Sequence, residues 1–321
     1  MWYIPDFVTP EDERYLTAGL YEKALAKEWE NLSGRRLITF GGTPPAGGDG
    51  AMIKEPLPPF IDALVNALVK AGVYADTEQI TAPGGGSAEA GAGPAVVPDG
   101  NSQHHQHQHQ LQERWRRQPA PRPNHVLCNE YIPGQGINPH KDGTRWYPKV
   151  AILSLTSPIL FHFWPPETLV DDGSKKTDVD GGGGGSERRG GSESTNDVNG
   201  VAAAAAAAAR PNMSVPAHSV LCMPRSLLVF EGWAYTELFH GIVPTQMDTL
   251  NKEQLTNYNE LPGELRDQLD LGTIQLPRQK RASLTLRHVL RTAAGDAVIA
   301  NGAAEEERTR SRAAFIRSID S

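Results

Sequence analysis

Residues of the kinds that bind transition metals occur at two places in this chain. His140 and Asp142 are separated by one residue in the segment YIPGQGINPHKDG, and His240 follows much later in FHGI. Residues i and i+2 of an extended strand project to the same face, so His140 and Asp142 can converge inside a barrel, and a distant strand can supply a third ligand. Two imidazoles and one carboxylate leave one face of a metal open, as in non-haem Fe(II) oxygenases. The alternative is a strand-end histidine that is hydrogen-bonded to a turn.

The run RASLTLR, from Arg281 to Arg287, alternates polar and apolar residues. If its apolar residues pack against helices outside the barrel, Arg281, Ser283 and Arg287 face the interior. An unpaired guanidinium there is costly, so this face calls for an anion. A dicarboxylate fits, because Arg281 can pair bidentately with its distal carboxylate while Ser283 donates from its hydroxyl and Arg287 supports the keto-acid end. The alternative is an edge strand that leaves both arginines in water.

A third polar pair lies just upstream of the His-x-Asp. Asn129 and Tyr131, in CNEYIPG, again have i, i+2 spacing, and both side chains can donate hydrogen bonds to a carboxylate. Taken separately, each residue is ordinary strand polarity. Together with the metal ligands and the two arginines, they predict a single site.

Two amphipathic helices and a series of short strands must position these residues. Thr9 is expected to cap a helix that begins at Pro10, with Asp12 completing a capping box, and a second apolar stripe follows Pro59. The later β-rich runs are HVLCNEY, KVAILSL, PILFHFW, HSVLCM, SLLVFEG, AYTELFHG and ASLTLRHVL. Many short strands without intervening helices favour an antiparallel barrel or jelly roll, mostly β, with the two N-terminal helices packed on one sheet.

Low-complexity segments interrupt this pattern. The 321 residues include 32 Gly and 25 Pro, and the segments 81–123 and 171–211 hold too few apolar residues to offset chain entropy. We therefore expect one domain over 1–300, interrupted by disordered insertions at 81–123 and 171–211, and a flexible tail at 301–321. The His/Gln-rich tract in the first insertion is interpreted as a solvated repeat, and it contains His104, His105, His107 and His109.

Composition and charge limit the class of protein. Two cysteines are too few for a disulfide scaffold or a four-thiolate zinc site. No apolar run approaches the ~20 residues of a membrane span, and the first residues lack the features of a secretory signal. We expect a soluble monomer of the cytoplasm or nucleus with no membrane partner. The net charge of −7 argues against coating nucleic acid by bulk electrostatics, although a local basic patch can still bind it.

The chemical motifs, in their order along the chain, resemble those of the AlkB-type Fe(II)- and 2-oxoglutarate-dependent dioxygenases. They are Asn129-x-Tyr131, His140-x-Asp142, His240 and the two arginines Arg281 and Arg287. Several segments, among them WYIPDFVTPEDERYL and NHVLCNEYIPGQGINPHKDG, resemble the AlkB homologue 6 branch of that family. The resemblance covers nearly all of the chain outside the low-complexity segments.

This resemblance implies a double-stranded β-helix, which is a jelly roll, with the site inside it. It implies that the iron ligands are His140, Asp142 and His240, and that the cosubstrate 2-oxoglutarate, used together with O2, is bound by Asn129, Tyr131, Arg281, Ser283 and Arg287. Some AlkB-type enzymes have Asn where this chain has Ser283, so the contact there is shorter. The implied activity is oxidative demethylation of an alkylated nucleobase in DNA or RNA.

The expected substrate is a methylated base in single-stranded nucleic acid, or one flipped out of a duplex. Arg35 and Arg36, and the segment RWRR at 114–117, suit phosphate pairing and base stacking. Trp146 and Tyr147 either border the pocket or pack in the core. Two alternatives stay open, a protein side-chain hydroxylase with the same iron and 2-oxoglutarate residues and a catalytically silent nucleic-acid-binding or adaptor protein. The complete ligand set counts against a silent protein, whereas the acidic net charge favours a protein substrate.

Overall fold

The computed structural model describes residues 1–45, 50–76, 120–166 and 216–293. The predicted tail, the His/Gln tract, the basic segment at 114–117 and nearly all of both predicted insertions lie outside the described residues. The last four residues of the first predicted insertion, 120–123, are described, and they are packed. Ala120 is 5% exposed and belongs to the core, so these four residues pack with the rest of the described domain.

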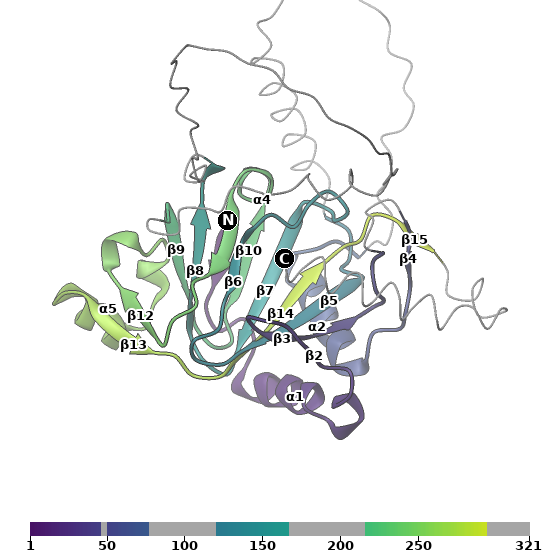
Figure 1. Cartoon of the computed structure of the whole chain (residues 1–321), viewed down its shortest axis with the longest axis horizontal. Helices are drawn as coiled ribbons and strands as arrows, with labels where there is room; N and C mark the ends of the chain where they lie inside the picture. The colour runs from purple at the N-terminus through teal and green to yellow at the C-terminus, as the bar shows by residue number, and fades with distance from the viewer. Residues whose placement is uncertain (46–49, 77–119, 167–215, 294–321) are drawn as a thin grey trace, which may run out of the picture.

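Eight strands form two antiparallel sheets that face each other. The larger sheet contains, in spatial order, β10 (Leu227–Glu231), β7 (Lys149–Leu155), β14 (Arg281–Arg287) and β5 (His125–Tyr131). The smaller sheet contains β6 (Ile137–His140), β11 (Phe239–Ile242), β8 (Ile159–Trp164) and β9 (His218–Cys222). Apart from the β8–β9 pair, successive strands of these eight lie in different sheets. This alternation defines a double-stranded β-helix and confirms the predicted jelly roll (Figure 1).

Three N-terminal strands extend the larger sheet at its two edges. The strand β1 (Trp2–Ile4) pairs with β10, whereas β3 (Arg36–Phe40) pairs with β5 and with β2 (Glu30–Asn31). A parallel pair, β4 (Met52–Ile53) and β15 (Thr292–Ala293), lies apart from both sheets. The N-terminal region therefore completes the sheet that carries β5 and β14.

Two helices cover the outer face of the larger sheet, as predicted. Helix α1 (Pro10–Leu20) begins with a capping box in which Thr9 and Asp12 exchange hydrogen bonds, and the short η1 (Lys23–Leu25) follows it. Helix α2 (Pro59–Lys70) packs its apolar stripe into the same core as the apolar residues of β14. No helix among the described residues combines the length and apolar character that crossing a membrane requires.

The helices determine which way β14 faces. Ala282, Leu284 and Leu286 are 0% exposed and belong to the core beneath the helices. Successive residues of a strand point to opposite faces, so the alternate polar residues of β14 point between the two sheets. Burial on the helix side thus fixes the orientation of the polar side chains inside the barrel, as the alternating sequence predicted.

The sequence AYTELFHG was expected to be a strand along its whole length, and this prediction is wrong for its first half. A short helix, α4 (Trp233–Thr236), precedes β11, which begins only at Phe239. Gly232, at φ +57°, reverses the chain after β10, and its carbonyl accepts hydrogen bonds from two amides of the new turn. The reversal needs a closed turn, and this requirement outweighs the β propensity of the sequence.

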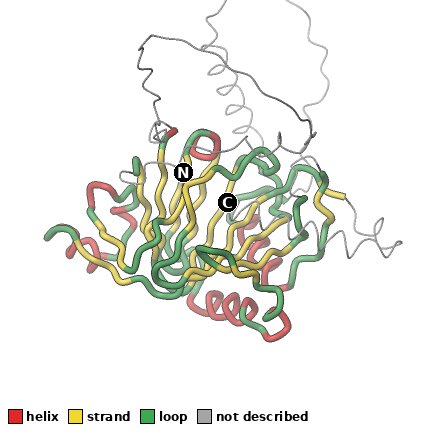
Figure 2. Tube along the Cα trace, viewed as in Figure 1, coloured by secondary structure: helices red, strands yellow, loops and turns green. Residues whose placement is uncertain are grey.

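A further unit packs outside the smaller sheet and was not predicted. It consists of the hairpin β12 (Met247–Leu250) and β13 (Ile274–Pro277), helix α5 (Gly263–Asp270) and the turns η3 (Lys252–Gln254) and η4 (Tyr258–Glu260). Leu160 of β8 and Leu221 of β9 join its apolar residues in one cluster. Figure 1 shows this unit on the far side of the strands from α2, and Figure 2 shows strands at the centre of the molecule with helices around them.

His162 of β8 lies under this outer unit and away from the cavity described below. Its side chain is 8% exposed, and its Nδ1 lies 2.9 Å from the Ser219 hydroxyl. Burial lowers the pKa of His162 to about 4, with Asp248 opposing the shift and Arg278 adding to it. The native state therefore holds this imidazole neutral at pH values where the unfolded chain protonates it.

Because of His162, the free energy of unfolding should decrease as the pH is lowered. Because the pKa is about 6.5 when unfolded and about 4 when folded, the native protein binds fewer protons than the unfolded chain in this range. The free energy of unfolding should be unaffected by His162 above pH 6.5 and decline by up to about 3 kcal/mol towards pH 4. We expect His162→Gln to reduce the slope of unfolding free energy against pH in this window, as measured by urea denaturation. Identical slopes in the two proteins would contradict the assignment.

Candidate active site

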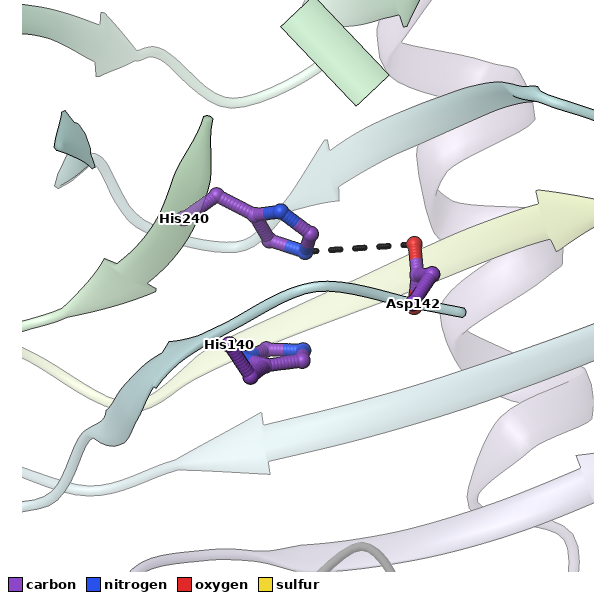
Figure 3. A group of neighbouring side chains, drawn as sticks. All are labelled: His140, Asp142 and His240. Atoms are coloured by element: carbon purple, nitrogen blue, oxygen red, sulfur yellow. Dashed lines mark ion pairs between the residues drawn. The ribbon is translucent and has the colours of Figure 1, made fainter. Parts of the chain in front are cut away.

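The pairing of β6 with β11 brings the two candidate metal-binding histidines together. His140 and His240 are direct partners in this antiparallel pair, and their ring centroids are 4.4 Å apart. Together with Asp142 they offer three ligand atoms that all lie within 4.8 Å of one another. Figure 3 shows the three side chains converging on a common point. The sequence-predicted group is therefore assembled by the fold.

Asp142 reaches this point by a different route from the one expected. Strand β6 ends at His140, so Asp142 lies in the following loop and is not placed by strand alternation. Gly143, at φ +84°, turns the chain directly afterwards, and its carbonyl accepts a 2.6 Å hydrogen bond from the Tyr235 hydroxyl. The helix α4 that replaced the expected strand thus holds the loop that carries Asp142.

The protonation states of the three side chains suit a divalent cation. Burial lowers the pKa of His140, and burial together with the neighbouring His140 lowers the pKa of His240 to about 3. Burial alone would raise the pKa of Asp142, but Arg287 and the two imidazoles outweigh it and lower that pKa. The site therefore combines two neutral imidazoles with one ionised carboxylate near neutral pH.

Hydrogen bonding leaves metal-binding atoms available. His140 Nδ1 lies 2.9 Å from the Asn138 carbonyl oxygen, which can only accept, so Nδ1 carries the proton and Nε2 keeps its lone pair. Asp142 Oδ2 is buried without a hydrogen-bond partner and lies 3.8 Å from His240 Nε2. A buried, unsatisfied carboxylate oxygen between two neutral imidazoles fits a bound Fe(II), and these three residues would hold it.

The polar face of β14 forms one wall of the same cavity. Arg281 is 1% exposed and donates to the Ser283 hydroxyl at 3.0 Å and the Ser154 hydroxyl at 2.8 Å. Its Nε has no hydrogen-bond partner, and no carboxylate of the described residues pairs with it. Burial lowers the pKa of Arg281. A buried guanidinium that donates hydrogen bonds only to neutral hydroxyls and still has donors to spare can bind an anion.

The predicted residues of β5 lie opposite those of β14. Tyr131 is the cross-strand partner of Arg281, and Asn129 is the partner of Ser283. Both side chains are buried, line the cavity and lie on the same face of the strand. The two i, i+2 pairs recognised separately in the sequence thus become one polar surface through the antiparallel register of β5 and β14.

Arg287 lies at the other end of this strand face and already has an acidic partner. Its Nη1 forms an ion pair with Asp142 Oδ1, and its guanidinium carbon lies 3.9 Å from the centre of the Trp146 ring. Arg287 therefore connects the polar wall of β14 to the carboxylate of the metal site. Its Nε is buried without a hydrogen-bond partner, which leaves one donor for a bound ligand.

All eight predicted site residues line one cavity of about 660 Å³, a volume in the usual range for small-molecule sites. Trp146 also lines it, whereas Tyr147 is buried in the core beneath the helices. Sequence reasoning passed over two polar residues of the interior, Ser154 and Thr285. Thr285 continues the alternation of Arg281 and Ser283, and Ser154 interrupts the apolar run KVAILSL, so both carried a signal in the sequence.

Arg35 and Arg36, expected to contact a nucleic-acid backbone together, lie on opposite faces. Arg36 pairs with Glu130 through Nε at 2.6 Å and Nη2 at 2.9 Å, and its guanidinium carbon lies 4.6 Å from the Trp29 ring centre. Arg35 is 4% exposed and lines the cavity. The carboxylate already neutralises Arg36, so only Arg35 is placed to act at the site.

Fold and site together define the chain as a double-stranded β-helix protein with a two-histidine, one-carboxylate group and a cationic wall in one cavity. Over 289 residues it is 28% identical to the probable RNA/DNA demethylase ALKBH6 of Danio rerio, a match covering 90% of this chain and 85% of that protein. This similarity confirms the resemblance to AlkB-type dioxygenases that the motifs indicated. No protein-family model matches the chain.

Two solved structures were also found to be similar. A structure of OsALKBH1 has a TM-score of 0.38 and 14% identity, and the match covers 89% of this chain and 96% of that one. A prolyl-4-hydroxylase of Pseudomonas putida has a TM-score of 0.36 and 10% identity, with coverage of 90% and 92%.

Proposed function

We propose that this chain is an Fe(II)- and 2-oxoglutarate-dependent dioxygenase that oxidatively demethylates alkylated nucleobases. One observation carries the proposal: the unsatisfied Oδ2 of Asp142, beside two neutral histidines, shares a cavity with the buried guanidinium of Arg281. A metal that needs open coordination positions and a cosubstrate that needs a cationic partner can both be accommodated there. The similarity to a protein described as a probable RNA/DNA demethylase supports the same activity.

The bound iron supplies oxidation, in which 2-oxoglutarate and O2 are converted to succinate and CO2 while a substrate C–H bond is hydroxylated. The protein's own residues supply position and charge. His140, Asp142 and His240 would hold the metal, and Arg281 would pair with the distal carboxylate of 2-oxoglutarate. The Ser283 hydroxyl accepts from Arg281 and keeps its own proton to donate. Asn129 and Tyr131 add donors on the facing strand.

Charge in the cavity favours an anionic substrate. Among the described residues, one carboxylate and five permanently cationic side chains line it, and the cations are Arg35, Lys141, Arg145, Arg281 and Arg287. A nucleic acid carries one phosphate per nucleotide and supplies further negative charge beside the target base. This local basic surface outweighs the acidic net charge of the whole chain as a guide to the substrate.

Turnover with defined substrates tests the proposal. The full chain with Fe(II) and labelled 2-oxoglutarate should form succinate faster with a methylated single-stranded oligonucleotide than with its unmethylated match, and release one formaldehyde per methyl group removed. A methylated duplex should react more slowly, because extruding the base costs about a few kcal/mol. Residues 1–45 contribute Arg35 to the cavity, so the intact chain is the material to use.

Two outcomes would contradict this proposal in different ways. Stimulation of succinate formation by peptides, with none by methylated oligonucleotides, would show a protein hydroxylase built on the same residues. Absence of 2-oxoglutarate binding by the iron-loaded chain would leave only a nucleic-acid-binding or adaptor role. An unmethylated oligonucleotide of the same sequence controls for binding without reaction.

A further inference from the structure

Arg35 lines the cavity although it is not one of the predicted 2-oxoglutarate residues. It lies one residue before β3, and it is 4% exposed. Asn129 of β5 is the cross-strand partner of Leu37, so Arg35, two residues earlier than Leu37, lies on the same strand face. Its Nε donates a 3.0 Å hydrogen bond to Asn129 Oδ1. The cationic side chain is thus directed at a residue of the proposed cosubstrate site.

The turn that carries Arg35 is tightly held. The Gly136 amide donates to the Gly34 carbonyl at 3.1 Å, and a Cβ atom at position 34 would lie 2.6 Å from the Gly136 oxygen. Only glycine fits so close an approach without displacement of the backbone. The Leu32 amide also donates to the Arg35 carbonyl at 2.8 Å. This turn is therefore packed against the connection between β5 and β6, and Arg35 starts from a fixed backbone position.

The hydrogen bond from Arg35 determines the orientation of the Asn129 amide. An asparagine side chain can present either its oxygen or its NH2 group in a given direction, but arginine has five donors and no acceptor. Because the partner can only donate, the Asn129 oxygen must face Arg35 and the NH2 group must face the other way. Asn129 is one of the residues that line the cavity, so the direction of its NH2 group bears on what the cavity can bind.

We propose that Arg35 is a positioning residue that fixes the Asn129 amide with its NH2 group directed at the carboxylate of bound 2-oxoglutarate. This inference rests on the proposed function and adds a residue to it. Without Arg35 the amide can rotate by half a turn and present its oxygen, which repels a carboxylate. The role also accounts for the burial of Arg35 next to Asn129, whereas the following residue, Arg36, is neutralised by Glu130 on the opposite face.

A double-mutant cycle distinguishes positioning from direct contact. Anaerobic titration of 2-oxoglutarate into the Fe(II)-loaded full chain should give a dissociation constant about tenfold higher for Arg35→Met and for Asn129→Ala than for the wild type. If Arg35 acts through Asn129, the double variant should bind no more weakly than Asn129→Ala alone. Losses that multiply would show that Arg35 acts on the cosubstrate by itself and would overturn the proposal.

Two further substitutions separate hydrogen-bond direction from packing. Arg35→Lys keeps a donor that cannot accept, so it should retain most of the affinity, whereas Arg35→Gln can accept as well as donate and should lose about as much as Arg35→Met. Arg35→Gln also serves if Arg35→Met fails to fold, because it keeps a polar group. Equal affinities in the Lys and Gln variants would contradict positioning.

Arg36→Met is the matched control, since Arg36 is the neighbouring arginine on the face away from the cavity. Its 2-oxoglutarate affinity should equal that of the wild type, and a loss as large as that of Arg35→Met would overturn the assignment. The Michaelis constant for 2-oxoglutarate should rise in Arg35→Met with little change in kcat. If the wild-type chain binds iron but no 2-oxoglutarate, the proposed function is overturned. If the wild type binds 2-oxoglutarate but the effects of Arg35→Met and Asn129→Ala on its affinity are additive, only the role of Arg35 is overturned.

Discussion

Replacing Asp142 by alanine is expected to weaken Fe(II) binding by more than about 100-fold, since even losing a side chain that merely supports a ligand typically costs about 10–100-fold. The carboxylate is the single negative charge among the three candidate ligands, and its Oδ2 is buried without a hydrogen-bond partner. Two neutral imidazoles alone leave the charge of the dication unbalanced in a buried site. Anaerobic Fe(II) titration and metal analysis of the purified variant measure the effect.

Asp142 also pairs with Arg287, so the same substitution should lower stability. Removing one partner of a buried ion pair typically costs about 3–5 kcal/mol, because the other charge remains buried and unpaired. Asp142→Asn separates the two effects, since it keeps a side-chain oxygen for Arg287 but not the charge that balances the metal. Metal affinity should therefore be low in both variants, while the free energy of unfolding of the metal-free protein should fall more in Asp142→Ala.

His162→Gln is the matched control for metal binding. It removes a buried histidine of β8 that lies outside the cavity, so its Fe(II) affinity should equal that of the wild type. Stoichiometric Fe(II) binding at wild-type affinity in both Asp142→Ala and His240→Ala would refute the assignment of the three ligands. Loss of binding in His162→Gln would indicate that metal affinity simply follows overall stability.

Strand alternation allowed most of the candidate site residues to be grouped from the sequence. Alternation in RASLTLR places Arg281 and Ser283 on one face, and the apolar residues between them identify the helix-covered side. The same alternation applies to Asn129 and Tyr131. What alternation cannot give is register, and it is the pairing of Tyr131 with Arg281 and of His140 with His240 that joins separate motifs into one cavity.

The sequence failed where tertiary contacts outweigh local preference. The segment AYTE has the residues of a strand, yet the reversal after β10 closes it into α4, and Tyr235 then reaches back to the Gly143 carbonyl. Arg35 and Arg36 look equivalent as neighbours in a basic pair. Only the presence of Glu130 on one face and Asn129 on the other gives them different roles, and neither partner can be recognised from local sequence.

Arg281→Met is expected to weaken 2-oxoglutarate binding by about 100-fold, the range for losing one partner of a buried charge-assisted pair. Fe(II) affinity should persist, because Arg281 contacts Ser154 and Ser283 and none of the candidate metal ligands. Arg281→Lys is the conservative variant, and it should bind with intermediate affinity because an ammonium keeps the charge but loses the bidentate geometry. Unchanged 2-oxoglutarate affinity in Arg281→Met would refute the anion-site assignment.

In the ligand-free protein, the same substitution is expected to increase stability. Wild-type Arg281 buries a charge with no carboxylate partner among the described residues, and replacing it by an apolar side chain of similar length removes that desolvation cost. Arg281→Met should therefore unfold at a higher temperature than the wild type without 2-oxoglutarate. At a 2-oxoglutarate concentration about 100 times the wild-type dissociation constant, binding should stabilise the wild type by about 2.7 kcal/mol, and the variant far less. Thermal unfolding with and without the cosubstrate measures both effects, and equal ligand-induced shifts in Tm would show that the cosubstrate binds without Arg281.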